Sequence, residues 1–213
     1  MLTAQGYIQD VQEHFATILV PLDRIYLISK QEITTCEVRF DDGRTIRPEQ
    51  RKKAYALIND IAAYTGHCQE ELKEHFKYDL MAKTGCAHFS LSDCSVSIAR
   101  EYISNMIDFC FQWDVPANDT RLNQTDDLGR YLYACLYYRK CAVCNKKAEI
   151  HHCEGSRVGM GFNRNKIDNF GRSAIALCRA HHMEAHQEEQ AFFEKYHLFG
   201  IRFDKQLLKK LKL

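Results

Sequence analysis

The sequence predicts an α+β protein in which a small domain of strands and helices precedes a metal-binding segment. Its 213 residues are 46% apolar and 27% charged, which is ordinary globular composition and enough to bury a core. Short apolar runs fill the first 44 residues, whereas apolar residues recur at helical spacing through most of the later chain. Histidine gathers late, since six of the ten histidines lie after residue 150. These three observations favour two α+β units, of which the second is organised by metal.

The first half of the chain is expected to begin with strands and to continue with helices. TILVPLDRIYLI is rich in apolar residues and TTCEVRF alternates before a turn at residues 41–43, so a small β element is expected up to about residue 44. Arg47-Pro48 then opens a helix, because proline is pre-set for the first helical turn, and Gly66 ends it. The expected helices are residues 47–66, 69–81, 98–113 and 128–138.

A break in periodicity marks the expected domain boundary. The segment VPANDT interrupts the helical pattern, and polar residues continue to residue 127. The sequence therefore predicts an amino-terminal α+β domain at residues 1–117, a linker at 118–127 and a second domain with a basic tail at 128–213.

The composition favours an intracellular protein. No run approaches the ~20 apolar residues of a membrane span, and the first fifteen residues have neither the basic nor the apolar region of a secretory signal. In a reducing compartment disulfides are a poor explanation for ten cysteines. Six scattered cysteines are therefore expected to be small buried hydrophobes, namely Cys36, Cys68, Cys86, Cys94, Cys110 and Cys135.

The net charge of +1 does not by itself indicate a nucleic-acid partner, but two local clusters do. The segment from residue 139 to residue 179 contains nine lysines and arginines but only three acidic residues. Five more basic residues lie at Arg44, Arg47, Arg51, Lys52 and Lys53. Such clusters can neutralise phosphates, and a solvated helix face is the alternative for either run.

One set of metal ligands is rich in sulfur. Cys141-x-x-Cys144 can place two thiolates on one ion, and Cys178-x-x-His181 supplies a second pair. Together they predict a closed tetrahedral Cys3His zinc site of the structural type. The alternative is two unrelated knuckles with free thiols, and a catalytic dithiol is disfavoured because no βαβ pattern surrounds the motif.

A second set consists of histidines. His182 and His186 lie one turn apart on an expected helix that continues through Phe193, and this spacing lets two imidazoles bind one ion. His151 and His152 lie in the strand-like segment AEIHH, so their side chains point to opposite faces. One of the pair can join the metal while the other serves as a general base, for which an ordinary imidazole pKa of ~6.5 is suited.

This order of motifs resembles the HNH, or ββα-metal, endonuclease family and in particular phage-encoded HNH proteins. The resemblance covers about residues 138–190. It implies that Cys141, Cys144, Cys178 and His181 hold a structural Zn²⁺. It also implies that His151 joins His182 and His186 on one catalytic ion, Mg²⁺ or Mn²⁺, and that His152 is the general base. A water polarised by His152 would attack the phosphodiester in line and leave 5′-phosphate products.

One position departs from the family pattern. Where the family has an asparagine that orients the loop around the base, nine residues before His182, this chain has Ser173. Asp168 and Asn169 are the neighbouring residues that could take its place, so Ser173 and Asn169 are counted with His152 among the catalytic candidates. The loop from Gly155 to Gly171 is long enough to contact a phosphate backbone.

The amino-terminal part resembles the NinB/Orf family of phage recombination mediators, whose fold binds single-stranded DNA. The likeness lies in a helix that opens with a basic Gln-Arg-Lys stretch and in a later helix that ends near Trp113 before Val-Pro. It implies DNA contacts by the basic residues of this part and of the later loop: Arg47, Arg51, Lys52, Lys53, Arg157, Arg164 and Arg172.

The sequence therefore predicts a metal-dependent HNH endonuclease that acts on single-stranded or branched DNA in phage recombination or DNA processing. The alternative is a non-catalytic single-stranded-DNA-binding mediator with a structural zinc knuckle. A purely structural zinc protein is a third and more distant alternative. A single-strand-binding protein, a recombinase and a second copy of the chain are the candidate protein partners, with no membrane. The expected location is the cytoplasm of a phage-infected or prophage-carrying bacterium.

Overall fold

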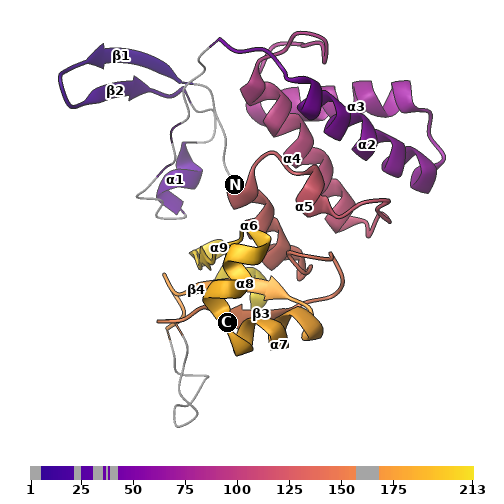
Figure 1. Cartoon of the computed structure of the whole chain (residues 1–213). Helices are drawn as coiled ribbons and strands as arrows, with labels where there is room; N and C mark the ends of the chain where they lie inside the picture. The colour runs from indigo at the N-terminus through magenta and orange to yellow at the C-terminus, as the bar shows by residue number, and fades with distance from the viewer. Residues whose placement is uncertain (1–5, 22–24, 31–35, 37, 39–42, 157–167) are drawn as a thin grey trace.

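The computed structural model describes residues 6–21, 25–30, 36, 38, 43–156 and 168–213, and these form a mixed α/β arrangement of helices with two small sheets (Figure 1). The prediction of an α+β chain is confirmed at this level. The elements in chain order are β1 (Tyr7–Val11), β2 (Ala16–Leu19), α1 (Tyr26–Lys30), α2 (Pro48–Thr65), α3 (Gln69–Thr84), α4 (Val96–Gln112), α5 (Arg121–Gln124), α6 (Leu128–Tyr138), β3 (Glu149–His152), β4 (Ser173–Leu177), α7 (Arg179–Gln187), α8 (Glu189–Tyr196), β5 (Ile201–Arg202) and α9 (Lys205–Leu211).

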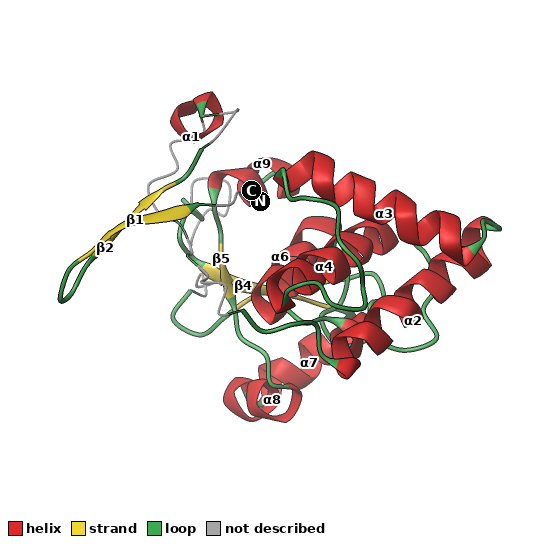
Figure 2. Ribbon diagram, turned by 90° about the horizontal axis from the view of Figure 1, so that it is seen from above, coloured by secondary structure: helices red, strands yellow, loops and turns green. Residues whose placement is uncertain are grey.

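The amino-terminal β element is a two-stranded hairpin that stands apart from the helices in both ribbon views (Figures 1 and 2). The prediction was wrong for the end of TILVPLDRIYLI, because residues 26–30 form α1. A short apolar run does not distinguish a strand from a helical turn by periodicity. Most of the second expected strand, TTCEVRF, lies outside the described residues.

The three long helices α2, α3 and α4 begin and end where local chemistry dictates. Pro48 occupies the first turn of α2, and the Gln50 side chain accepts the Arg47 N–H at 3.1 Å. Gly66 and Gly85 end α2 and α3 in the left-handed conformation, with φ of 77° and 74°. The expected helices at 47–66, 69–81 and 98–113 are confirmed, although α3 runs to Thr84.

Helix α6 connects the preceding helices (α2 to α5) to the carboxyl-terminal strands and helices, and its bounds are those expected from the sequence. It contacts α4 on one side and β4, β5 and α9 on the other. Its buried side chains join one apolar cluster that extends from α2 to α9. The ligand-bearing elements are therefore anchored on a core that extends from Ile46 to Leu211 and does not include the amino-terminal hairpin.

The expected linker at 118–127 contains α5 and several buried side chains. Arg121, only 1% exposed at its side chain, pairs with Asp60 of α2 at 2.6 Å. Its backbone N–H donates to Asn145 Oδ1 at 2.7 Å, beside the Cys141–Cys144 knuckle. The division into domains at 1–117 and 128–213 stays a prediction. The segment between them contacts residues on both sides of the expected boundary, Asp60 before it and Asn145 after it.

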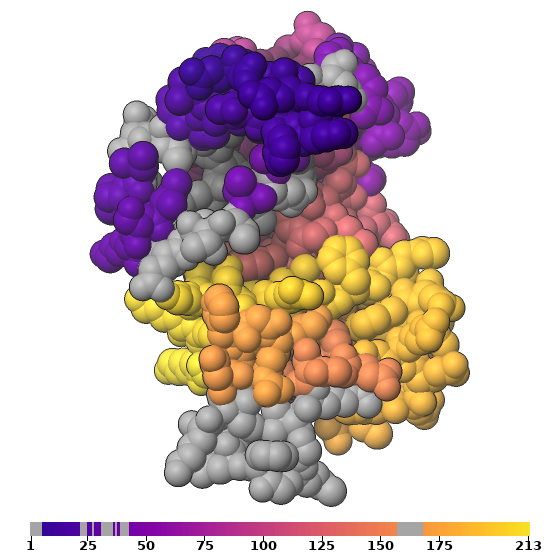
Figure 3. Space-filling model, turned by 90° about the vertical axis from the view of Figure 1, so that its left-hand side faces the viewer, coloured from indigo at the N-terminus to yellow at the C-terminus, as the bar shows by residue number. Residues whose placement is uncertain are grey.

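The carboxyl-terminal sheet has the order β3-β4-β5 with antiparallel pairs, and α7 follows β4 directly. The prediction of a single helix from His182 through Phe193 was wrong, because extended backbone at Glu188 (φ −154°, ψ 95°) separates α7 from α8. The basic tail forms α9, which buries Leu207 and Leu211. Figure 3 shows the hairpin at the top of one face and the carboxyl-terminal elements in its lower part.

Of the six scattered cysteines, four are buried as expected, but Cys36 and Cys68 are exposed. Cys68 precedes α3, where its sulfur accepts the Glu71 N–H, so it serves as a helix cap rather than as a core residue. Among the described helices none combines the length and apolarity that crossing a membrane requires.

Candidate metal centres

Two adjacent clusters of potential metal ligands are built on β3, β4 and α7. Strand β3 pairs with β4 so that His151 lies opposite Ile175. The Ala142 N–H, inside the knuckle, donates to the Ala176 carbonyl of β4 at 2.9 Å. Because Cys178 immediately precedes α7, the helix begins inside one cluster and carries His182 and His186 into the other. The ββα order is visible in Figure 1.

The first cluster consists of Cys141, Cys144, Cys178 and His181, whose ligand atoms all lie within 4.8 Å of one another. Sγ of Cys144 lies 3.7 Å from Sγ of Cys178, and His181 Nδ1 lies 3.4 and 3.3 Å from the sulfurs of Cys141 and Cys178. Zn–S bonds of about 2.3 Å in a tetrahedron place two sulfurs about 3.8 Å apart. The spacing of these atoms therefore fits one Zn²⁺.

The thiols of this cluster differ in acidity. Burial raises the pKa of Cys141 to about 12. Burial alone would also raise the pKa of Cys178, but hydrogen bonds from the backbone of His181 and from the thiols of Cys144 and Cys141 lower it. Cys178, at the start of α7, is therefore the readier thiolate, and a bound cation would deprotonate its neighbours.

The second cluster consists of His151, His182 and His186, whose nearest ligand nitrogens also lie within 4.8 Å of one another. The His151 ring centroid lies 4.9 Å from that of His182 and 4.8 Å from that of His186. His151 is fully buried, whereas His186 is exposed. One side of the cluster is thus closed by protein and the other is open, as catalytic metal sites require.

His151 also offers a nitrogen suited to an ion. Its Nδ1 is buried and has no hydrogen-bond partner in the described part of the chain. A buried polar atom without a partner is costly, and bound metal is one way to satisfy it. Burial lowers the pKa of His151, against the opposing effect of Glu189. The neutral ring that this favours is the form that binds metal.

Two carboxylates contact the histidine cluster, and neither was anticipated from the sequence. Glu189 Oε2 lies 2.9 Å from His151 Nε2, and Glu149 Oε2 lies 2.8 Å from His182 Nδ1. The hydrogen bond with His182 lowers the pKa of Glu149. Glu149 could have been found, because residues two apart in a strand share a face. Glu189 could not, because its position depends on the break between α7 and α8.

His152 points away from the histidine cluster, as strand alternation predicts. Its ring packs edge-on against Phe203, with centroids 5.8 Å apart. Ser173 begins β4 and by register shares the face of His151, since Ala174 is the residue opposite His152. The catalytic roles of His152, Ser173 and Asn169 stay predictions.

The loop candidates are described in part. The Asp168 side chain accepts the Phe170 N–H, and the Asn169 carbonyl accepts the Arg172 N–H. Arg172 donates to the carbonyls of Asp168 at 2.9 Å and Ser156 at 3.1 Å, so it ties together the two ends of the loop. Arg157 and Arg164 lie outside the described residues.

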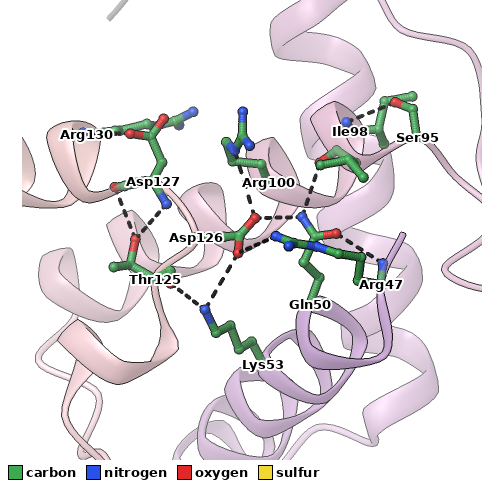
Figure 4. Close-up of polar contacts among 11 residues, drawn as sticks. Arg47, Gln50, Lys53, Ser95, Ile98, Arg100, Thr125, Asp126, Asp127 and Arg130 are labelled. Carbon is green, nitrogen blue, oxygen red and sulfur yellow. Dashed lines mark hydrogen bonds and ion pairs between the residues drawn. The ribbon is translucent and has the colours of Figure 1, made fainter. Parts of the chain in front are cut away.

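The amino-terminal basic residues have mixed surroundings. Figure 4 shows Asp126 among Arg47, Lys53 and Arg100, whose nitrogens lie 3.9, 3.5 and 3.8 Å from its carboxylate. Lys53 also donates to the Thr125 carbonyl at 2.7 Å. Three cations around one carboxylate leave positive charge at a site where the Arg47 side chain is 57% exposed.

The other two members of this basic group differ from each other. Arg51 donates to the carbonyls of Leu91 and Ser92 at 2.8 and 2.6 Å, so it fixes the segment before α4. Lys52 is exposed to solvent. Contact with DNA by any of these residues stays a prediction.

A family model described as "Putative HNHc nuclease" matches residues 20–213. The match covers helices α2, α3 and α4 as well as both clusters of potential metal ligands. No curated protein and no solved structure matches the chain.

Proposed function

The chain belongs to this HNHc nuclease family, and from that premise we propose that it is a metal-dependent endonuclease that hydrolyses phosphodiester bonds in DNA. The observation that carries the proposal is the convergence of His151, His182 and His186 around a buried nitrogen that lacks a partner. The neighbouring sulfur cluster supplies a separate site for a structural ion, so the histidines are not needed for that purpose.

The two clusters have different tasks in this proposal. Cys141, Cys144, Cys178 and His181 would hold Zn²⁺, which would join the knuckle to the start of α7 and so fix the helix against the sheet. His151, His182 and His186 would hold a divalent ion, which would supply positive charge to neutralise the charge that develops on the phosphate and on the departing 3′ oxygen. The three imidazoles hold their places through β3 and α7 before any substrate arrives.

The chemistry of the donor set favours Mn²⁺ over Mg²⁺. Mg²⁺ is a hard cation that prefers oxygen ligands in octahedral geometry, whereas imidazole suits transition metals. The triad offers three imidazoles and no carboxylate within its own ligand set. Activity with Mn²⁺ is therefore expected to exceed activity with Mg²⁺.

His152 is the proposed general base. It follows the ligand His151 in the same strand and points to the other face, packed against Phe203. A ring held there would accept the proton of the attacking water, and the family resemblance assigns this position the same role.

DNA is the proposed substrate, single-stranded or branched, in phage recombination or DNA processing, because the amino-terminal part resembles phage recombination mediators. Lys52 and the partly exposed Arg47 are the described residues best placed to contact phosphates, since Arg51 and Lys53 hold internal carbonyl contacts. Arg172 is less suited to contact DNA directly, because its side chain is hydrogen-bonded to carbonyls at the two ends of the loop.

The test is cleavage of supercoiled plasmid, single-stranded and branched DNA with Mn²⁺ or Mg²⁺. Wild-type protein is expected to cut, and His152→Ala to cut about 10²–10⁴-fold more slowly, because general-base catalysis contributes about that factor. His67→Ala is the matched control, since His67 is exposed and lies far along the chain from both clusters. Wild-type rates in His152→Ala would refute the base assignment. No cleavage of any substrate, with salt-dependent single-strand binding retained, would favour the non-catalytic mediator instead.

A further inference from the structure

Two carboxylates contact the histidine cluster, and each is hydrogen-bonded to a different histidine. Glu189, the first residue of α8, contacts Nε2 of His151 at 2.9 Å. Glu149, the first residue of β3, contacts Nδ1 of His182 at 2.8 Å. The two contacts therefore engage opposite ring nitrogens, Nε2 in one histidine and Nδ1 in the other.

A carboxylate beside an imidazole decides which nitrogen carries the proton. A neutral ring has one N–H donor and one lone pair, and an ionised carboxylate can only accept. The proton therefore resides on the nitrogen that faces the carboxylate, and the lone pair is left on the other nitrogen. For His151 the lone pair is on Nδ1, the buried atom without a partner. For His182 it is on Nε2.

We propose that Glu189 and Glu149 are positioning residues, which fix the tautomers of His151 and His182 so that the triad presents His151 Nδ1 and His182 Nε2 to the ion. The inference rests on the proposed metal site and deepens it. Hydrogen-bonded outer carboxylates also orient the rings and raise the basicity of the ligand nitrogen. Mixed use of Nδ1 and Nε2 is a specific consequence of this geometry.

The backbone around Glu189 is arranged to hold its carboxylate in place. The extended conformation of Glu188 breaks the helix and turns the start of α8 toward β3. The second carboxylate oxygen, Oε1, accepts the Glu154 N–H at 2.6 Å, just beyond the end of β3. With both oxygens engaged and the side chain only 8% exposed, Glu189 has little freedom to leave His151.

Glu149 is held less firmly. Its side chain is 51% exposed, and its Oε2 is shared with Arg179 at 3.4 Å. Solvent and salt weaken an exposed charged contact more than a buried one. Glu189 is therefore expected to matter more than Glu149.

Titration of zinc-loaded protein with MnCl₂ tests the proposal by calorimetry, independently of DNA cleavage. Glu189→Ala is expected to weaken Mn²⁺ binding about 10–100-fold, the usual effect of removing an outer-shell partner. Glu149→Ala is expected to weaken Mn²⁺ binding as well, but by a factor several-fold smaller than that of Glu189→Ala. Glu194→Ala is the matched control, because it removes the same charge from an exposed position of the same helix α8, and its affinity is expected to equal that of the wild type.

A second measurement separates positioning from mere support of the fold. In zinc-loaded, Mn²⁺-free protein, ¹⁵N chemical shifts of the histidine rings report which nitrogen is protonated. The wild type is expected to show His151 as the Nε2–H tautomer and His182 as the Nδ1–H tautomer. In Glu189→Gln the amide N–H can donate to His151 Nε2 and so favour a proton on Nδ1, with zinc content unchanged.

The outcomes distinguish this inference from the proposed function. Mn²⁺ affinity of Glu189→Ala within twofold of the wild type, while His182→Ala abolishes binding, would overturn the positioning role and leave the metal site intact. The opposite tautomers in the wild type would overturn it as well. If the wild type does not bind Mn²⁺, or if it binds Mn²⁺ and His182→Ala does not remove this binding, the metal assignment itself fails and the inference fails with it.

Discussion

The two ligand clusters share one helix and differ in ligand type, ligand number and exposure. His181 and His182 are neighbours on α7, yet the first lies with three sulfurs and the second with two imidazoles. The sulfur cluster supplies four ligands that surround their centre, and Cys141 is fully buried. The histidine cluster supplies three and has an exposed member, His186. A complete shell leaves no position for substrate, whereas an incomplete one does.

The clusters also differ in what they hold together. The ligands of the sulfur cluster come from the knuckle after α6 and from the start of α7, so an ion there would close a loop of the chain that contains β3 and β4. The histidines of the second cluster already lie on paired β3 and on α7, and carboxylates are hydrogen-bonded to two of them. Loss of the first ion is therefore expected to affect folding, and loss of the second to affect binding and chemistry.

The largest effect is expected for Cys141→Ser. Structural Zn²⁺ in small motifs contributes apparent binding free energies of about 10–16 kcal/mol, so its loss should unfold the elements from β3 onward. The expected result is a protein without stoichiometric zinc whose thermal transition is lowered or split. Cys68→Ser is the control, since serine can replace the capping sulfur before α3. Full zinc content together with an unchanged transition in Cys141→Ser would contradict the structural assignment.

The next effect concerns the open cluster alone. His186→Ala removes an exposed ligand, so the thermal transition of zinc-loaded, Mn²⁺-free protein should change little. Affinity for Mn²⁺ should fall at least about 100-fold, more than for loss of an outer carboxylate. Calorimetry and zinc analysis of the same sample measure both. A concurrent loss of zinc would mean that the clusters are not independent.

The sequence predicted the ligand sets because their geometry is local. A C-x-x-C knuckle, a helical pair such as His182 and His186, and alternation along Glu149–His152 each follow from a few residues of backbone geometry. In the structure the candidate ligand atoms of each set lie within 4.8 Å of one another, and their roles as ligands stay predictions. The family match supports the nuclease assignment.

The features that the sequence did not predict depend on long-range packing. The break at Glu188 that delivers Glu189 to His151 has no glycine or proline to announce it. Strand β5 consists of two residues, and only its pairing with Ser173 and Ala174 identifies it. The helix α1 arose from an apolar run that fits strand and helix equally.

The smallest effect tests how far the sulfur cluster depends on its surroundings. Asn145 follows the knuckle with φ of 58°, and its side chain contacts the Tyr131 hydroxyl at 2.7 Å and the Arg121 N–H at 2.7 Å. Asn145→Gly keeps the left-handed backbone without strain but removes these contacts. Their loss should cost about 1–3 kcal/mol, or roughly 2–4 °C in the thermal transition for each kcal/mol.

Zinc should leave Asn145→Gly faster in the presence of a chelator, while Mn²⁺ affinity at the triad stays that of the wild type. Asn145→Ala is the matched variant, because it removes the same contacts and adds left-handed strain of about 1–2 kcal/mol. It should therefore be the less stable of the two. Equal zinc release in the wild type and both variants would mean that the ligands alone hold the knuckle. A fall in Mn²⁺ affinity in Asn145→Gly would instead mean that α7 transmits disturbance from His181 to His182, and the separation of the two clusters would be lost.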